Sequence, residues 1–89
     1  MVEYDSPHKI VLYPYVTEKT MIQMEEENKL EFVVDLKANK IQITDAIEKL
    51  FEVEVDKVNT RIDKHGKRAT VKFTEEYNAE EIGMRIGVF

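Results

Sequence analysis

The sequence predicts a single α+β domain in which helices cover a four-stranded sheet, with the element order β-α-β-α-β-β-α. A chain of 89 residues can close one hydrophobic core. Its composition, 43% hydrophobic and 35% charged with few glycines and prolines, is that of a folded domain rather than a disordered tail. Segments with the two-residue period of strands alternate along the chain with segments that have helical spacing. A short turn separates the last two strands, so these must be antiparallel.

The first part of the chain predicts a strand, a helix and a second strand. Residues 9–13 (KIVLY) are apolar and β-prone, and Pro14 ends this strand because it cannot donate to a ladder. Thr17 is a predicted helix N-cap, and the helix extends to about Glu26. The second strand is indicated by alternating apolar side chains that share one buried face, namely Leu30, Phe32, Val34 and Leu36.

The second predicted helix has the clearest pattern. Asn39 and Gln42 have the spacing of a capping box, so the helix is expected to begin at Lys40. Its apolar residues follow at intervals of three and four, as Ile43, Ala46, Ile47, Leu50 and Phe51. A stripe this broad is typical of a helix that packs against a sheet.

The third strand has two possible starts. Val53 and Val55 share one parity, whereas Val58 has the other. The strand therefore either starts after Asp56 or contains a bulge, and the pattern leaves both alternatives open.

The end of the chain predicts a hairpin and a short helix. Residues 64–67 (KHGK) surround a glycine and suit a tight turn, which leads to a fourth strand at about residues 68–74. Asn78 and Glu81 repeat the capping spacing, and a short closing helix is expected after them.

Charge is unevenly distributed. The formal net charge is -5, yet residues 57–72 carry only one acid, Asp63, and a cluster of cations. The cations are Lys57, Arg61, Lys64, Lys67, Arg68 and Lys72, and His65 lies among them. One interpretation is a solvated hairpin whose cations balance acids elsewhere in the fold. The other is a contact with a polyanion, in which the cluster neutralises phosphates.

Several classes of function lack the residues they need. Without cysteine there is no disulfide framework and no thiolate metal site, so the cytosol is the default compartment. His8 and His65 have no companion ligand at a recognised metal spacing, and Ser6 is the sole serine. We expect no metal, no cofactor and no enzymatic activity. The apolar runs are too short to insert in a membrane, and the acidic start does not suit a signal peptide.

Two segments resemble a known family. Residues 14–20 read PYVTEKT, and residues 37–60 read KANKIQITDAIEKLFEVEVDKVNT. Together they resemble the large-subunit ribosomal protein numbered twenty-three, and the resemblance covers residues 9–89. The short turn at residues 64–67 and the ending NAEEIGMRIGVF are similar to the archaeal branch.

The resemblance implies a fold and a function. The fold would be a three-layer α/β/α sandwich with an antiparallel sheet in the order 1-2-4-3, formed by residues 9–89 after a flexible segment 1–8. The function would be that of a structural constituent of the large ribosomal subunit in the cytoplasm. It would bind large-subunit ribosomal RNA near the nascent-chain exit tunnel, beside neighbouring ribosomal proteins. The isolated domain is expected to be monomeric.

The resemblance also implies roles for individual residues. The RNA-facing positions would be Thr17, Lys19, Lys37, Lys40, Asn59 and Thr60. Glu18 would help to dock factors that meet emerging chains, such as the signal recognition particle. We add Asn39 and the basic hairpin residues Lys57, Arg61, Lys64, His65, Lys67, Arg68 and Lys72 to the candidate RNA contacts, because cations reach phosphates and amides bond 2′-hydroxyls. The alternative is a non-ribosomal interaction module that binds an acidic partner through this hairpin.

Overall fold

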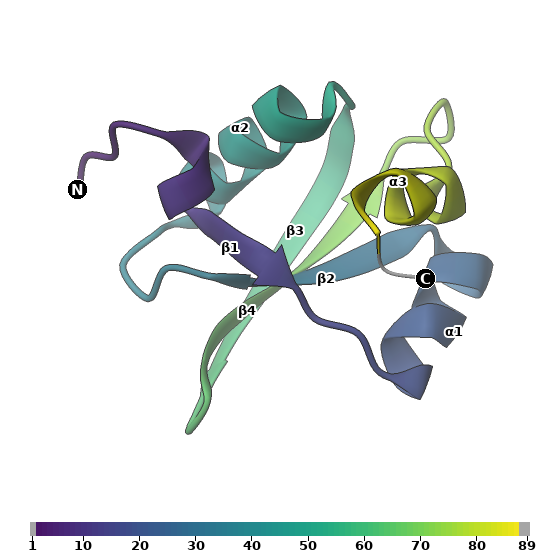
Figure 1. The fold of residues 1–89 in the computed structure, drawn as a ribbon, viewed down its shortest axis with the longest axis horizontal. Helices are drawn as coiled ribbons and strands as arrows, with labels where there is room; N and C mark the ends of the chain where they lie inside the picture. The colour runs from purple at the N-terminus through teal and green to yellow at the C-terminus, as the bar shows by residue number, and fades with distance from the viewer. Residues whose placement is uncertain (1, 88–89) are drawn as a thin grey trace.

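The computed structural model describes residues 2–87 and contains a four-stranded sheet with three α-helices (Figure 1). The predicted flexible segment 1–8 and domain 9–89 extend beyond this range at Met1 and at residues 88–89, which lie outside the described residues. The elements are the 3-10 helix η1 (Pro7–Lys9), β1 (Val11–Pro14), α1 (Glu18–Glu27), β2 (Lys29–Val34), α2 (Lys40–Phe51), β3 (Val55–Asp63), β4 (Gly66–Phe73) and α3 (Ala79–Ile86).

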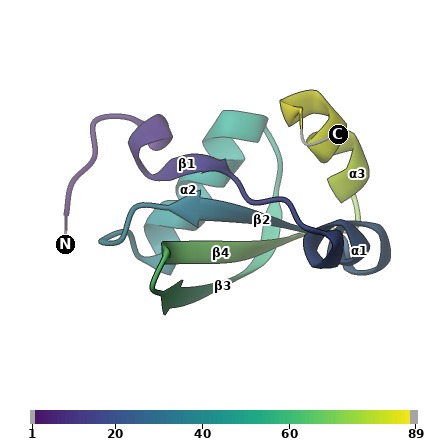
Figure 2. The same ribbon diagram turned by 60° about the horizontal axis from the view of Figure 1, so that its bottom comes forward.

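The sheet has the strand order β1-β2-β4-β3, and every neighbouring pair is antiparallel. The predicted α+β class, the element order and the strand order 1-2-4-3 are confirmed. Figure 2 shows α2 behind the strands and α1 beside the start of β2, while the near side of β3 and β4 faces the viewer without a helix in front of it. The long β3–β4 hairpin projects from this arrangement.

One face of the sheet carries the core. Phe32 and Val71 are fully buried there, and the ring of Phe51 from α2 stacks on Phe32 with 5.6 Å between centroids. From the helices, Ile47 of α2 and Ile82 of α3 complete this core, which buries the apolar stripes of both helices. Phe73 of β4 is buried on the same face, two residues after Val71.

The helix starts agree with the capping signals. Thr17 accepts a hydrogen bond from the Thr20 N–H, and the Thr20 hydroxyl accepts one from the Thr17 N–H. Asn39 and Gln42 form the predicted reciprocal pair. Asn78 caps α3 by accepting from two N–H groups of its first turn. These caps satisfy N–H groups that a helix leaves without internal partners.

The first two strands differ from the prediction at their ends. Lys9 belongs to η1 rather than to β1, because Ser6 caps a short 3-10 turn that begins with Pro7. The β2 strand ends at Val34, and Leu36 is 57% exposed instead of buried. Leu36 lies in the turn that leads to α2, where the strand alternation no longer applies.

The structure decides between the two starts of the third strand. The β3 strand begins at Val55, and its register against β4 shifts between Val55 and Lys57, so the strand contains an irregularity of the bulge type. The fourth strand begins at Gly66 rather than at residue 68. Gly66 has a φ of 122°, a conformation that side chains with a Cβ avoid.

Asn28 joins three elements at one point. It ends α1 in the left-handed conformation, with a φ of 57°. Its Nδ2 donates to three carbonyl oxygens, those of Phe73 and Thr74 at 3.3 Å and that of Tyr77 at 2.8 Å. Its Oδ1 accepts from the Ala79 N–H at 2.7 Å. One side chain thus holds the end of β4 and the start of α3 against the turn after α1.

Replacing Asn28 should destabilise the fold even when the new residue tolerates the left-handed backbone conformation. Asn28→Gly keeps the left-handed conformation but removes the amide, so we expect the free energy of unfolding to fall by about 2 to 3 kcal/mol. The matched control is Glu52→Gly, at the exposed C-cap of α2 with a φ of 55°. This change relieves backbone strain and should stabilise by about 0.5 to 1 kcal/mol. Urea unfolding measures both, and equal effects of the two variants would contradict the role of the Asn28 amide.

Candidate functional site

The second face of the sheet is polar, and the strand register arranges it in rows. Residues directly opposite on neighbouring strands project from the same face. Across β2, β4 and β3 the successive rows are Lys29, Lys72 and Lys57; Glu31, Thr70 and Asn59; and Val33, Arg68 and Arg61. We call these nine residues the cationic sheet face. Five of the nine are basic, although the chain as a whole is acidic.

The first row places like charges directly opposite one another. Lys72 of β4 stands between Lys29 and Lys57, and such pairs are unfavourable in an isolated sheet. Lys29 has a counter-ion, the Glu27 carboxylate at 3.1 Å. Lys57 and Lys72 are exposed, and neither has an ion-pair partner among residues 2–87. Two free ammonium groups therefore lie side by side on this face.

Glu31 is the buried acid of the cationic sheet face. Its side chain is only 2% exposed, and its Oε1 accepts from Arg61 Nη2 and from the Thr70 hydroxyl, each at 3.1 Å. The Arg61 side chain remains 50% exposed. A buried carboxylate needs such partners, because an unpaired one is strongly destabilising. Arg61 therefore has a structural role in addition to any contact that it makes with a ligand.

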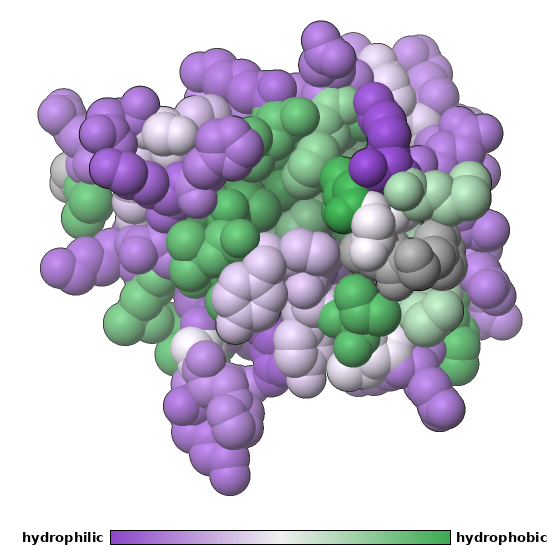
Figure 3. Space-filling model, viewed as in Figure 1, coloured by the Kyte–Doolittle hydropathy of each residue, from purple (hydrophilic) through white to green (hydrophobic). Residues whose placement is uncertain are grey.

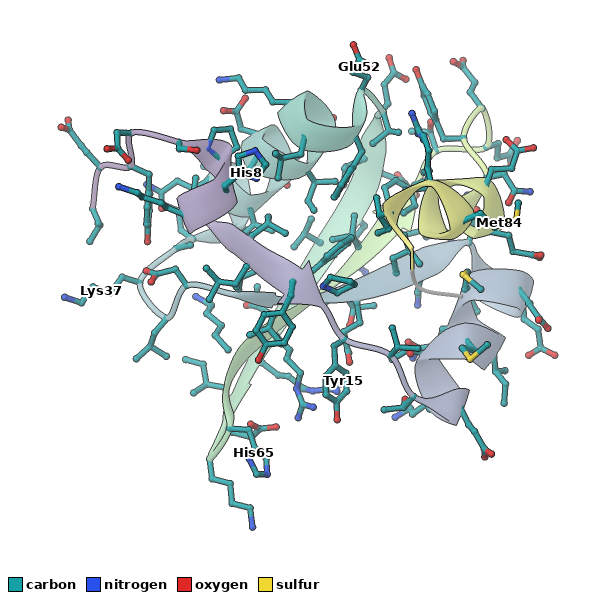
Figure 4. All side chains as sticks on the ribbon, viewed as in Figure 1. His8, Tyr15, Lys37, Glu52, His65 and Met84 are labelled. Carbon is teal, nitrogen blue, oxygen red and sulfur yellow. The ribbon has the colours of Figure 1, made fainter. Side chains whose placement is uncertain are left out.

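Arg68 is also held in place. Its guanidinium binds Asp63 and lies under the ring of Tyr15, with 4.4 Å to the ring centroid. The side chain is 13% exposed, and its Nε is buried without a hydrogen-bond partner within the described residues. Figure 4 shows Tyr15 just beyond the end of β1, on the segment that leads to α1. Arg68 thus forms part of the rigid floor of the site.

A second group of candidates gathers at the start of α2. Lys37, Asn39 and Lys40 are exposed there, and Lys67 reaches the group from β4 by donating to the Ala38 carbonyl at 2.5 Å. Lys67 stands opposite Val34, so it projects from the core side of the sheet. The structure thus separates Lys67 from its neighbour Arg68.

The turn before α2 is fixed by the N-terminal segment. The Tyr4 hydroxyl donates to the Asp35 carboxylate at 2.6 Å, and the Lys37 N–H donates to the same oxygen at 3.2 Å. The bond with Asp35 raises the pKa of Tyr4 to about 12, and the bond from Tyr4 holds the pKa of Asp35 below its usual range. The Lys37 side chain itself extends away from the body of the protein (Figure 4).

The remaining candidates lie elsewhere on the surface. Glu18 and Lys19 are exposed in the first turn of α1, beside the half-buried cap Thr17. Lys64 and His65 form the exposed tip of the hairpin, whose surface is hydrophilic in Figure 3. Asn59 and Thr60 have opposite orientations, because Asn59 stands opposite Thr70 and Thr60 opposite Ala69 on the core side.

Sequence reasoning missed several members of the site. Lys29, Glu31 and Thr70 were not among the candidates, although the alternation that buries Leu30 and Phe32 already places Lys29 and Glu31 on the other face. Only the pairing of β2 with β4 brings Thr70 to Glu31. These three residues, with the apolar Val33, complete the cationic sheet face.

The described residues offer little for other chemistry. Within residues 2–87 no group of three histidine, aspartate or glutamate side chains could hold a metal ion. His8 and His65 lie at separate places on the molecule (Figure 4). Over the same residues, no helix combines the length and apolarity that crossing a membrane requires.

Removing Arg61 should destabilise the fold, because the buried Glu31 carboxylate loses its counter-ion. We expect Arg61→Ala to lower the free energy of unfolding by about 2 to 3 kcal/mol. In a Glu31→Gln background the same change should cost less than about 1 kcal/mol, because no charge is left unpaired. Lys72→Ala, on the same face but without a partner, serves as the control. Denaturant unfolding of the unaltered protein, Arg61→Ala, Glu31→Gln and the double variant forms a double-mutant cycle. If Arg61→Ala lowers the free energy of unfolding equally with and without Glu31→Gln, the pairing is refuted.

Comparison with known proteins identifies the family. Residues 9–82 match the profile of the family described as Ribosomal protein L23. Three archaeal proteins named large ribosomal subunit protein uL23 are similar over nearly their whole length. The protein of Picrophilus torridus is 47% identical over 79 residues, which is 89% of this chain and 96% of the relative. Those of Thermoplasma acidophilum and Haloarcula marismortui are 48% identical over 80 residues and 43% identical over 81, each covering 90% of this chain and 95% of the relative.

These matches confirm the resemblance seen in the sequence, including its archaeal character. They also confirm the expectation that the chain is not an enzyme, because the matched family is one of ribosomal proteins. The matched residues 9–82 extend from the 3-10 helix η1 into α3 and so include all four strands. The chain therefore belongs to the Ribosomal protein L23 family.

Proposed function

We propose that this protein is a structural constituent of the large ribosomal subunit in the cytoplasm, and that it binds large-subunit ribosomal RNA near the nascent-chain exit tunnel. The family and the names of the archaeal relatives support the ribosomal role. The RNA contact is supported by the cationic sheet face, and its place near the tunnel by the resemblance of residues 14–20 and 37–60. Neighbouring ribosomal proteins are further partners, and the isolated domain is a monomer.

The observation that carries this proposal is the row of three lysines across β2, β4 and β3. Lys57 and Lys72 stand opposite each other with no counter-ion among the described residues. Bringing like charges together costs free energy in the unbound domain. A polyanion removes this cost when its phosphates lie along the row and release their counter-ions. An open sheet face with free ammonium groups is therefore a suitable phosphate-binding surface.

The acidic net charge is compatible with this contact, because many acids lie on other elements. Glu25, Glu26 and Glu27 end α1, while Glu80 and Glu81 begin α3. All five are exposed. They repel RNA from the helical side and so favour one orientation of the domain, with the sheet face toward the nucleic acid.

The other candidate residues extend the same contact. Lys37 and Lys40 at the start of α2, Lys19 at the start of α1, and Lys64 at the hairpin tip are exposed cations that reach phosphates outside the sheet. Asn59 supplies an amide on the sheet face itself. Contacts of this kind position the protein on folded RNA, and the shape of the RNA supplies the specificity.

Glu18 is a separate docking point. It is exposed at the start of α1, away from the lysine row, and a carboxylate there is stabilised by the helix dipole. A free, oriented acid of this kind suits a basic partner surface. The resemblance names that partner as the signal recognition particle.

Neutralising the free lysines should weaken RNA binding and its salt dependence. For the Lys57→Gln, Lys72→Gln double variant, the slope of log affinity against log salt should fall by about 1.5. The matched control is Lys9→Gln with Lys49→Gln, which removes the same charge from exposed lysines paired with Asp5 and Asp45. Filter binding to archaeal large-subunit ribosomal RNA across a salt series measures the slopes.

An equal fall in slope for both double variants would show that net charge, not the sheet face, controls binding. Retained binding to an acidic protein with none to ribosomal RNA would favour the interaction-module alternative.

Changing Glu18 should affect factor docking without affecting RNA. We expect Glu18→Gln to reduce co-sedimentation of the signal recognition particle with reconstituted large subunits, while the affinity for RNA is unchanged. Glu25→Gln, on the same helix and also exposed, is the control. Equal docking by Glu18→Gln and the unaltered protein would exclude Glu18 as the contact.

A further inference from the structure

The cationic sheet face continues onto β1, where it ends in an aromatic side chain. Tyr13 stands opposite Val33, and the same row continues through Arg68 to Arg61. Residues that share a row project from the same face. Tyr13 therefore belongs to the surface that carries the free lysines, and the residue is 58% exposed.

The two tyrosines at this edge differ in their contacts. The Tyr15 ring covers the Arg68 guanidinium, which Asp63 also holds. The Tyr13 side chain, in contrast, makes no hydrogen bond and no ring contact within residues 2–87. Tyr15 and Arg68 thus form a fixed floor, and the Tyr13 ring is left open beside it.

We propose that Tyr13 is the stacking platform for an unpaired base of RNA, so that the sheet face binds a single-stranded or looped segment. The proposal rests on the RNA-binding function proposed above and names the form of RNA that is bound. Base faces stack on exposed aromatic rings, whereas cations beside the ring hold the backbone. Both kinds of side chain share this one face.

The dimensions of the sheet suit a short unpaired segment. Three strand spacings of about 4.8 Å separate β1 from β3, so Tyr13 lies roughly 14 Å from the strand that carries Lys57. Four-stranded sheets that bind RNA hold roughly two or three stacked bases over a similar width. When a base stacks on Tyr13, the RNA backbone next to that base can therefore cross the sheet face toward Lys72 and Lys57.

An intact duplex fits this surface poorly. Within a helix the base faces are covered by their neighbours, so a ring such as Tyr13 has nothing to stack on except at an end. The row beside Tyr13 also contains groups that read base edges or 2′-hydroxyls. These are the exposed Asn59 amide and, as an acceptor only, the Thr70 hydroxyl opposite it, which donates its proton to Glu31. Unpaired nucleotides can use both, which favours a loop over a duplex.

The test compares Tyr13→Ala, Tyr13→Phe and Leu12→Ala in the full-length protein. Leu12 is the neighbouring residue of β1 and is 49% exposed, so Leu12→Ala is the control for lost apolar surface. Affinity for archaeal large-subunit ribosomal RNA is measured across a salt series. Competition with single-stranded oligoadenylate and with the same strand annealed to its complement follows.

Stacking predicts a distinct result for each variant. Tyr13→Ala should weaken RNA binding by about 5- to 150-fold, since base stacking on an aromatic ring contributes about 1 to 3 kcal/mol. The salt slope should not change, because no charge is removed. Tyr13→Phe and Leu12→Ala should keep the original affinity, and only the single-stranded competitor should displace the RNA effectively.

Other results overturn the proposal in recognisable ways. If Tyr13→Ala binds RNA normally while the Lys57→Gln, Lys72→Gln variant is weakened, RNA binding stands and stacking is wrong. A duplex that competes as well as the single strand also refutes stacking. If Tyr13→Ala loses only binding to a neighbouring ribosomal protein, Tyr13 is a protein contact. If the unaltered protein does not bind ribosomal RNA, both proposals fail together.

Discussion

The register of β4 between β2 and β3 is the constraint on which both faces of the sheet depend. Val71 stands between Leu30 and Val58 on the core side, and the next residue, Lys72, stands between Lys29 and Lys57 on the other. A slip by one residue would move the lysine into the core and the valine into water. The hydrophobic effect that holds the core together therefore also assembles the lysine row, although it exerts no direct force on it.

This coupling explains how an acidic domain can keep a concentrated group of cations. The two arginines of the face have internal counter-charges, Glu31 for Arg61 and Asp63 for Arg68. In the outer row Lys29 pairs with Glu27, and among residues 2–87 Lys57 and Lys72 have no such partner. Burial of Glu31 is tolerable because its bonds form within the sheet, independently of any ligand. The face is thus stable without any ligand, and the unbalanced charge remains where the phosphate of the proposed RNA partner can reach it.

Local signals predicted the helices well, because a cap and its helix lie within a few residues of each other. Thr17 and Asn39 were identified in this way, and both caps have the expected bonds. The site was less predictable, since its rows depend on pairing between strands far apart in sequence. Glu31 and Thr70 meet across 39 positions, and nothing local to either residue indicates the other. The presence of a bulge in β3 could not be predicted for the same reason, because the pairing of β3 with β4 determines it.

The candidate contacts differ in how much freedom they lose on binding. Thr17 and Asn39 already use their side-chain oxygens as caps, and Lys67 and Arg68 are held by Ala38 and Asp63. These groups can contact RNA only from fixed positions, so they select its shape at little cost in entropy. Exposed lysines such as Lys57 and Lys72 must order long side chains, which offsets part of their attraction. The fixed groups therefore suit an RNA whose shape they match first. The exposed lysines beside them then neutralise its phosphates.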